Sequence, residues 1–220
     1  MYLRIELLSD TAFGRGDGIA SHVNSEIEHD KATGLPIIKG RTLKGLFVEA
    51  CADILYGLKT CNSSTYNNFE KSAKSLFGTP GSGLDSTGKL HFGTATLPQG
   101  MVQTVQAAPD KYPPNQVLES FTTIRHQTAV DEATDIPKDT SLRAIRVVLR
   151  GTIFHAPISH PDLNQDKTAL SLLWACANTV RNAGQNRTRG LGHIRVELYT
   201  DKSELVTGEQ FNQLVRGVAS

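Results

Sequence analysis

The sequence predicts an α+β fold with a ferredoxin-like core, in which the elements follow the order β-α-β-β-α-β and the loops carry insertions. Two observations lead to this prediction. Short segments near both ends of the chain alternate apolar and polar residues, as strands do, and two longer segments repeat apolar residues at helical spacing. No internal repeat of fixed period occurs. We therefore expect one domain over residues 1–220.

The first half of the chain is expected to supply a strand, two helices and a second strand. Residues Tyr2 to Ser9 alternate in the manner of a half-buried strand. Residues Thr42 to Leu58 place apolar side chains mostly three and four positions apart, which predicts a helix. A weaker pattern of this kind covers Tyr66 to Phe77. After a glycine-rich loop, Lys89 to Leu97 are expected to form a short strand.

The second half of the chain begins with a long segment that shows no period. Residues 98–141 are interrupted by prolines, and an irregular stretch of about 40 residues inside a compact domain is typical of a functional excursion. Residues 141–154 are then expected to form one central strand, residues 168–181 a helix, and residues 194–199 the last strand. A basic loop with glycines, residues 185–193, joins that helix to the last strand.

The composition is that of an ordinary soluble protein, with 39% hydrophobic residues, 20% charged residues and a formal net charge of +1. Three cysteines without a CxxC pair do not form a disulfide framework, and the N-terminal sequence lacks the pattern of a signal peptide. No apolar run is long enough to cross a membrane. We therefore expect a cytoplasmic protein without a membrane partner. Any polyanion would have to be bound by a local basic patch.

Three basic residues gather where the first long helix is expected to begin: Lys39, Arg41 and Lys44. The N-terminus of a helix already carries partial positive charge, so cations at this place favour a nearby anion. A phosphate group fits, because it accepts hydrogen bonds from the free N–H groups of the first turn, and Gly40 would permit its close approach. The alternative interpretation is that these residues are solvated surface cations.

The loop before the last strand is a second basic candidate. It contains Arg187 and Arg189, then the pair Gly190 and Gly192, and ends at His193. In a ferredoxin-like sheet this loop lies at one end of the sheet, where its cations and flexible glycines suit RNA. The alternative is that the two glycines only make a turn.

Acidic and imidazole groups crowd the first long loop, between residues 17 and 30. Carboxylates such as Asp17 and Glu26 allow binding of a divalent metal ion or acid–base chemistry at a phosphodiester. Their spacing matches no zinc or EF-hand signature. Residues of these types are usually surface groups when they occur alone, so the loop is a candidate site and no more. Its other polar members are His22, Glu28, His29 and Asp30.

The pair Arg125 and His126 lies in the irregular segment. The histidine could serve as a general base for a ribose 2′-hydroxyl, although a polar loop residue is the more ordinary interpretation. No GxSxG context occurs, so hydrolase triads are set aside. The RNA-binding candidates of the whole chain are Arg15, His22, Lys39, Arg41, Lys44, Arg125, Arg187, Arg189 and His193.

Together, several passages resemble the RAMP superfamily of CRISPR-associated proteins, the repeat-associated RNA-binding proteins built on modified RRM folds. The passage GLPIIKGRTLKGLF resembles a glycine- and lysine-bearing motif of this family, and LFGTPGSGLDSTGKLHFGTA resembles its LFG-to-strand passage. The passage RTRGLGHIRVEL is similar to its C-terminal glycine-rich loop and strand. TIRHQTAVDEATDIPKDTSLRAIRVV resembles the region where backbone subunits of type III complexes have a thumb.

The resemblance implies an RRM-like fold and a role as a backbone subunit of a type III effector complex, of the III-D branch. Such a subunit holds guide RNA and uses a thumb-like excursion to interrupt the guide–target duplex. The implied partners are the CRISPR guide RNA, target RNA, other RAMP-type subunits and the large signature subunit of the complex. A subunit that caps the 5′ tag of the guide is an alternative within the family. An unrelated small-molecule enzyme on this fold is another.

The resemblance also bears on catalysis. In several backbone subunits an aspartate in the first long loop supports metal-dependent cutting of target RNA, for which Mg²⁺ is the implied cofactor. The position that aligns with this aspartate is Asn24. An amide can bind a cation, but it cannot act as a base. Three interpretations stay open: a non-cutting subunit, an active endoribonuclease that uses Asp17, Glu26 or His126, and an engineered substitution that traps target RNA.

Overall fold

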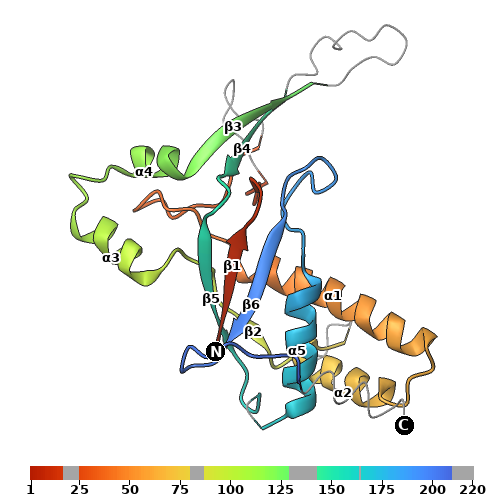
Figure 1. Ribbon diagram of the computed structural model, residues 1–220. Helices are drawn as coiled ribbons and strands as arrows, with labels where there is room; N and C mark the ends of the chain where they lie inside the picture. Colours follow the sequence, from red (N-terminus) through yellow and green to blue (C-terminus); the bar gives the residue numbers. More distant parts are fainter. Residues whose placement is uncertain (17–24, 80–86, 129–142, 164, 210–220) are drawn as a thin grey trace, which may run out of the picture.

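The computed structural model describes residues 1–16, 25–79, 87–128, 143–163 and 165–209 (Figure 1). No helix in these ranges is long and apolar enough to span a bilayer. The elements are β1 (Tyr2–Leu7), α1 (Gly40–Thr60), α2 (Tyr66–Phe77), β2 (His91–Phe92), α3 (Gln99–Ala107), α4 (Pro114–Phe121), β3 (Thr122–Gln127), β4 (Arg143–Val148), β5 (Ile153–Ser159), α5 (Lys167–Thr179) and β6 (Ile194–Tyr199).

The central sheet has four antiparallel strands in the order β2-β5-β1-β6. Numbered along the core alone, this is the order 2-3-1-4, in which α1 and α2 connect the first two core strands and α5 connects the last two. In the middle of the sheet, Ile5 of β1 pairs with Phe154 of β5 and with Val196 of β6. The predicted α+β fold with a ferredoxin-like core is therefore confirmed.

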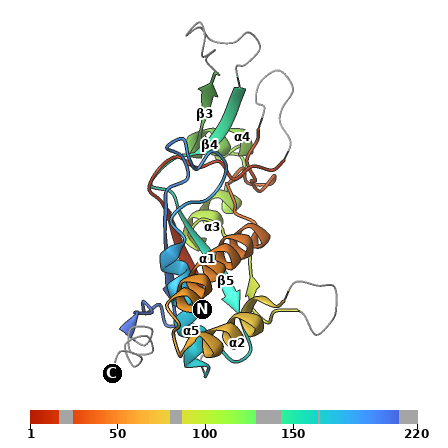
Figure 2. The same ribbon diagram turned by 90° about the vertical axis from the view of Figure 1, so that its right-hand side faces the viewer.

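The main core lies between this sheet and a layer formed by α1, α2 and α5, which pack on one another (Figure 2). Alternate residues of β1, Leu3, Ile5 and Leu7, are buried beneath these helices, because successive side chains of a strand point to opposite faces. The helices contribute large buried rings, among them Phe47 of α1 and Phe69 of α2. This layer fixes the start of α1 relative to the end of the sheet.

Most elements of the core lie where the sequence predicts them. Helix α2 and strand β6 have the predicted bounds, and β1 ends two residues earlier than expected. Helix α1 begins at Gly40 and ends at Thr60, two residues beyond the prediction at each end. Helix α5 begins after Asp166, whose side chain accepts a hydrogen bond from the N–H of Ala169 at 2.9 Å and so caps the helix.

Three predictions about the middle of the chain are wrong. The segment 98–141 is not irregular, because it contains α3, α4 and β3, while its residues 129–141 lie outside the described ranges. Residues 141–154 do not form one strand, since β4 and β5 are separated by a turn in which Gly151 has a φ of +81°. The strand expected over residues 89–97 is reduced to β2, although Thr96 also forms an isolated bridge to β5.

Strands β3 and β4 form a separate antiparallel pair, here called the ribbon, which projects beyond the end of the central sheet (Figure 1). The pairing runs from Thr122 opposite Val148 to Gln127 opposite Arg143. A small second core of Ala12, Ile145 and Val147 lies at the ribbon and is covered by Leu191. The ribbon occupies the part of the chain in which the resemblance implies a thumb.

Candidate nucleic-acid interface

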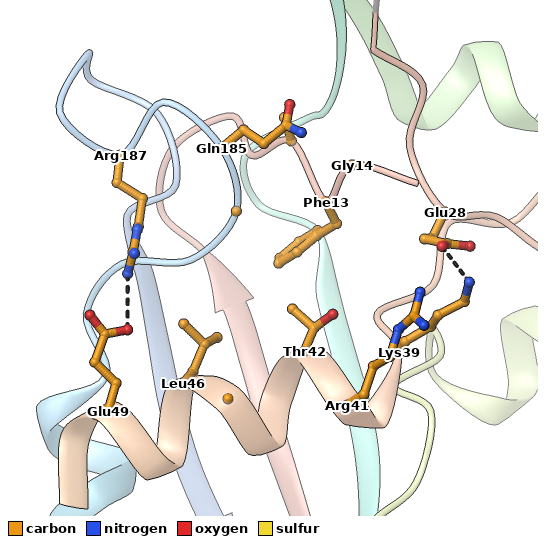
Figure 3. A pocket seen from close by; sticks show the side chains of 13 residues that line it. Phe13, Gly14, Glu28, Lys39, Arg41, Thr42, Leu46, Glu49, Gln185 and Arg187 are labelled. Carbon is orange, nitrogen blue, oxygen red and sulfur yellow. Dashed lines mark hydrogen bonds and ion pairs between the residues drawn. The ribbon is translucent and has the colours of Figure 1, made fainter. Parts of the chain in front are cut away.

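A groove with a volume of about 360 Å³ lies between the first half of α1 and the loop before β6 (Figure 3). We call it the α1 groove. Its walls come from four segments: Phe13 and its neighbours after β1, Glu28, the stretch from Lys39 to Glu49, and the stretch from Gly184 to Arg187. The structure thus brings the two basic loops of the sequence together, with Lys39, Arg41 and Arg187 on one groove.

The three cations of the α1 groove differ in how they are paired. Lys39 forms an ion pair with Glu28, whose side chain is only 10% exposed. Arg187 places its Nη1 3.4 Å from an Oε2 of Glu49 on α1, and both of these side chains are exposed (Figure 3). Arg41 is exposed and has no ion pair within the described residues. Arg41 is therefore the cation most available to an anion from outside.

The N-terminus of α1 adds hydrogen-bond donors to this groove. No side chain caps the helix, and its first turn contains no acidic residue. The first helical hydrogen bond runs from the N–H of Thr42 to the carbonyl oxygen of Lys39 at 2.9 Å. Within the described residues, the backbone N–H groups of Gly40 and Arg41 therefore have no protein acceptor. Free N–H groups beside a guanidinium form a suitable environment for phosphate oxygens.

Gly40 has a packing role in addition to the one that the sequence indicates. A Cβ on this residue would lie 2.0 Å from the carbonyl oxygen of Phe92 in β2. The glycine therefore lets the start of α1 pack against β2, and the expected close approach of a phosphate to its backbone stays a prediction. This close packing still serves the groove, because it fixes the position of the helix N-terminus that Arg41 flanks.

The loop from Gly184 to His193, here called the glycine loop, is fixed at its base and open at its tip. Gly184 and Gly192 have positive φ angles, and a Cβ on either would lie within about 2.5 Å of a backbone oxygen, that of Ala12 or that of Ala183. Gly190 also has a positive φ, of +75°, but no atom lies within 4 Å of its Cβ position. The glycines at the base are thus needed for packing, whereas Gly190 faces open space.

The remaining basic candidates lie at or near these loops, outside the lining of the α1 groove. Lys44 is half-buried on α1, one turn after its start. Arg189 and His193 are exposed on the glycine loop. Arg15 is half-buried, and its N–H donates to the carbonyl oxygen of Glu26 at 2.8 Å. His22 lies outside the described residues. The structure therefore gathers Lys39, Arg41 and Arg187 more closely than the other candidates.

Asp10, which the sequence analysis missed, connects three segments at the base of the ribbon. Its Oδ2 accepts a hydrogen bond from the Nε of Arg125 at 3.1 Å, and its Oδ1 accepts one from the backbone N–H of Arg150 at 3.1 Å. Its carbonyl oxygen accepts the N–H of Gly192 at 2.9 Å. Burial alone would raise the pKa of Asp10, but the hydrogen bonds from Arg125 and Arg150 to its carboxylate and the two arginine charges outweigh burial and lower the pKa below its usual value.

Glu26, an alternative catalytic carboxylate in the sequence analysis, is a buried structural residue. Its side chain is 2% exposed and forms an ion pair with Arg146 of β4 at 2.9 Å. The N–H of Ile27 donates to the same carboxylate at 3.0 Å. Arg146 also donates to the hydroxyl of Thr122 on β3 at 3.1 Å. With both oxygens engaged in this way, the geometry gives no support to a catalytic role for Glu26.

The other catalytic candidates do not form a site within the described residues. His126 is exposed on β3, where its backbone pairs with Ala144. Asp17 and Asn24 lie outside the described ranges. In the ranges that the structure covers, no three His, Cys, Asp or Glu residues are grouped so that they could hold a metal ion.

Comparisons with known proteins agree with this architecture. The family model described as the RAMP superfamily matches residues 4–195. A chain in the cryo-EM structure of the type III-B Cmr-beta complex bound to cognate target RNA has a TM-score of 0.63 and 11% identity, and the match covers 89% of this chain and 95% of that chain. A chain of apo Cmr-beta has a TM-score of 0.62 and 12% identity, with coverage of 91% and 97%. No curated protein gives a significant match. At these identities the two solved structures show a shared fold.

Proposed function

This chain belongs to the RAMP superfamily, and on that premise we propose that it is an RNA-binding backbone subunit of a type III CRISPR RNA-guided effector complex. The observation that carries this proposal is the α1 groove. Arg41 and the free N–H groups at the start of α1 lie at one end of the groove, and Arg187 of the glycine loop lines its other end, where it faces Glu49 (Figure 3). Donors of this kind bind RNA through its phosphates, without regard to sequence.

The proposed partners follow from the family and from the shape of the chain. They are guide RNA, target RNA, other RAMP-type subunits and a large signature subunit, assembled in the cytoplasm. The projecting ribbon supports a thumb-like contact with the guide–target duplex (Figure 1). Both solved structures of similar fold are chains of type III-B complexes, while the III-D branch is indicated only by sequence motifs and stays a prediction.

The α1 groove can be tested by binding of a labelled single-stranded RNA to the full chain over a salt series. We expect Arg41→Ala to weaken binding and to lower the slope of log affinity against log salt by about one, because one phosphate contact is lost. Lys59→Ala is the matched control, since Lys59 lies in the last turn of the same helix. Equal slopes for the two variants would refute the proposed groove.

We further propose that the chain with Asn24 is a non-cutting subunit. The support is chemical: an amide does not supply the negative charge that favours a metal-bound hydroxide. The test uses labelled target RNA and the assembled complex with Mg²⁺, comparing the chain with its Asn24→Asp variant. Cutting by the aspartate variant alone is the expected result. Cutting by the unsubstituted chain would overturn this proposal and favour Asp17 or His126.

The alternative role as the subunit that caps the 5′ tag of the guide predicts a different stoichiometry. A backbone subunit repeats along the guide RNA, whereas a capping subunit is present once. Native mass spectrometry of the assembled complex measures this copy number directly. One copy per complex would replace the backbone assignment with the capping one.

A further inference from the structure

A second groove lies on the other side of the glycine loop, between this loop and the turn that joins β4 to β5. Its volume is about 620 Å³, and we call it the Arg150 groove. The charged residues that line it are two arginines, Arg125 and Arg150, and one carboxylate, Asp10. The rest of its lining is Leu8, Ser9, Leu149, Gly190 and Leu191.

The two arginines of this groove have different surroundings. Arg125 is held by the buried carboxylate of Asp10, so its charge is largely neutralised. Arg150 donates its backbone N–H to Asp10 at 3.1 Å, and its charge also lowers the pKa of Asp10, but within the described residues its side chain forms no hydrogen bond with that carboxylate. The side chain of Arg150 is exposed and, in the part of the chain that the structure describes, forms no ion pair. The guanidinium of Arg125 is therefore held in the wall of the groove, whereas that of Arg150 can bind an anion.

The glycine loop lies between the two grooves, and residues only a few positions apart in this loop line one groove or the other. Arg187 lines the α1 groove, and Gly190 and Leu191 line the Arg150 groove. At Gly190 the loop has no side chain and faces open space, so a ligand backbone can approach the main chain there. Leu191 packs on the small core at the ribbon, which fixes the loop in this position. A strand that leaves the α1 groove can thus cross the tip of the loop and reach Arg150.

We propose that the Arg150 groove is a second phosphate-binding site, and that one RNA strand spans both grooves across the glycine loop. This inference rests on the proposed RNA-binding function and adds to it a binding residue, Arg150, and a direction for the strand, from α1 toward the base of the ribbon. Arg150 contacts a phosphate, because a guanidinium binds phosphate oxygens with two parallel hydrogen bonds. Arg125 is a positioning residue that acts through Asp10.

The test compares Arg150→Ala, Arg41→Ala and the double variant, using the full chain and a labelled single-stranded RNA over a salt series. Arg150→Ala keeps the backbone N–H that Asp10 accepts, so the wall of the groove is retained. We expect the salt slope to fall by about one in each single variant and by about two in the double variant. Arg150→Lys should keep most of the slope, because the charge is retained.

Arg195→Ala is the control, since Arg195 is an exposed arginine of β6 that lines neither groove. If Arg41→Ala lowers the salt slope and Arg150→Ala has the same salt slope as Arg195→Ala, the second site is overturned and the proposed function stays intact. Control-like slopes in both variants would overturn the proposed function itself. A reduced slope in Arg150→Ala alone would show a phosphate contact at Arg150, but it would reject the α1 groove and overturn the strand that spans both grooves.

Discussion

Arg146 and Glu26 form an ion pair in the interior of the protein, in which the arginine Nε lies 2.9 Å from Oε1 and 3.1 Å from Oε2 of the glutamate. The side chains are 14% and 2% exposed. Because Arg146 belongs to β4 and also donates to Thr122 of β3, the pair attaches both strands of the ribbon to the segment that follows the first long loop. The ribbon is thus anchored at its base by a buried charge.

This anchor predicts a large loss of stability in Arg146→Ala. Removal of one partner leaves the carboxylate of Glu26 buried without a counter-charge, which costs about 3–5 kcal/mol of unfolding free energy. Urea unfolding monitored by circular dichroism measures the loss. Arg143→Ala is the control, because Arg143 lies on the same strand and is exposed. A loss no larger than that of the control would show that Glu26 is not held in this way.

A second prediction concerns two glycines of α1 that have different surroundings. Gly40→Ala is expected to lower the unfolding free energy by about 1–3 kcal/mol, because the new Cβ would overlap the carbonyl oxygen of Phe92. Gly57→Ala meets no atom within 4 Å, so it should raise stability by about 0.5–1 kcal/mol through helix propensity. Thermal unfolding of both variants checks the opposite signs. Stabilisation by both substitutions would contradict the close packing of α1 on β2.

A third prediction is that Glu49 competes with RNA for Arg187. The pair is exposed on both sides, and such pairs contribute only about 0.2–1 kcal/mol, so a phosphate can displace the glutamate. We expect Glu49→Gln to tighten RNA binding about two- to five-fold at moderate salt. Glu119→Gln is the control for a general change of charge, because Glu119 is an exposed carboxylate of α4 that does not line the α1 groove. Equal gains in both variants would count against direct competition.

A fourth prediction uses the lowered pKa of Asp10. Because the folded-state pKa lies below the unfolded value of about 3.9, Asp10 contributes stability above that pH and loses it as the pH falls through the folded pKa. The difference in unfolding free energy between the chain and its Asp10→Asn variant should therefore be constant above about pH 5 and shrink below about pH 4. Urea unfolding from pH 3 to pH 7 measures it. A difference that stays constant down to pH 3 would be inconsistent with this pairing.

The core could be predicted from the sequence because its signals are local. Alternation in β1 and helical spacing in α1, α2 and α5 arise from one buried face on each element, and each face can be recognised within a short window. The prediction that residues 98–141 are irregular is wrong for a local reason as well. The prolines of this segment favour irregular structure, whereas Pro114 occupies the first turn of α4, where its missing N–H has no cost.

The contacts that shape the site could not be predicted in this way. Asp10 and Arg125 are 115 residues apart, and Glu26 and Arg146 are 120 residues apart. No pattern within a short window distinguishes such partners from surface charges. The basic residues can be recognised in the sequence. Which of them form ion pairs, however, depends on carboxylates that are distant in the sequence. The sequence does not single out Arg150, because the contact of this residue with Asp10 exists only in the folded chain.

The turn between β4 and β5 has a mechanical consequence. Strand β5 is the direct neighbour of β1 in the sheet, and only four residues separate it from β4. A force applied to the outer end of the ribbon would therefore be transmitted through this short turn to the middle of the sheet. Because hydrogen bonds to Asp10 and Glu26 hold the base of the ribbon, a load on its far end would be transmitted to the strands that support both grooves.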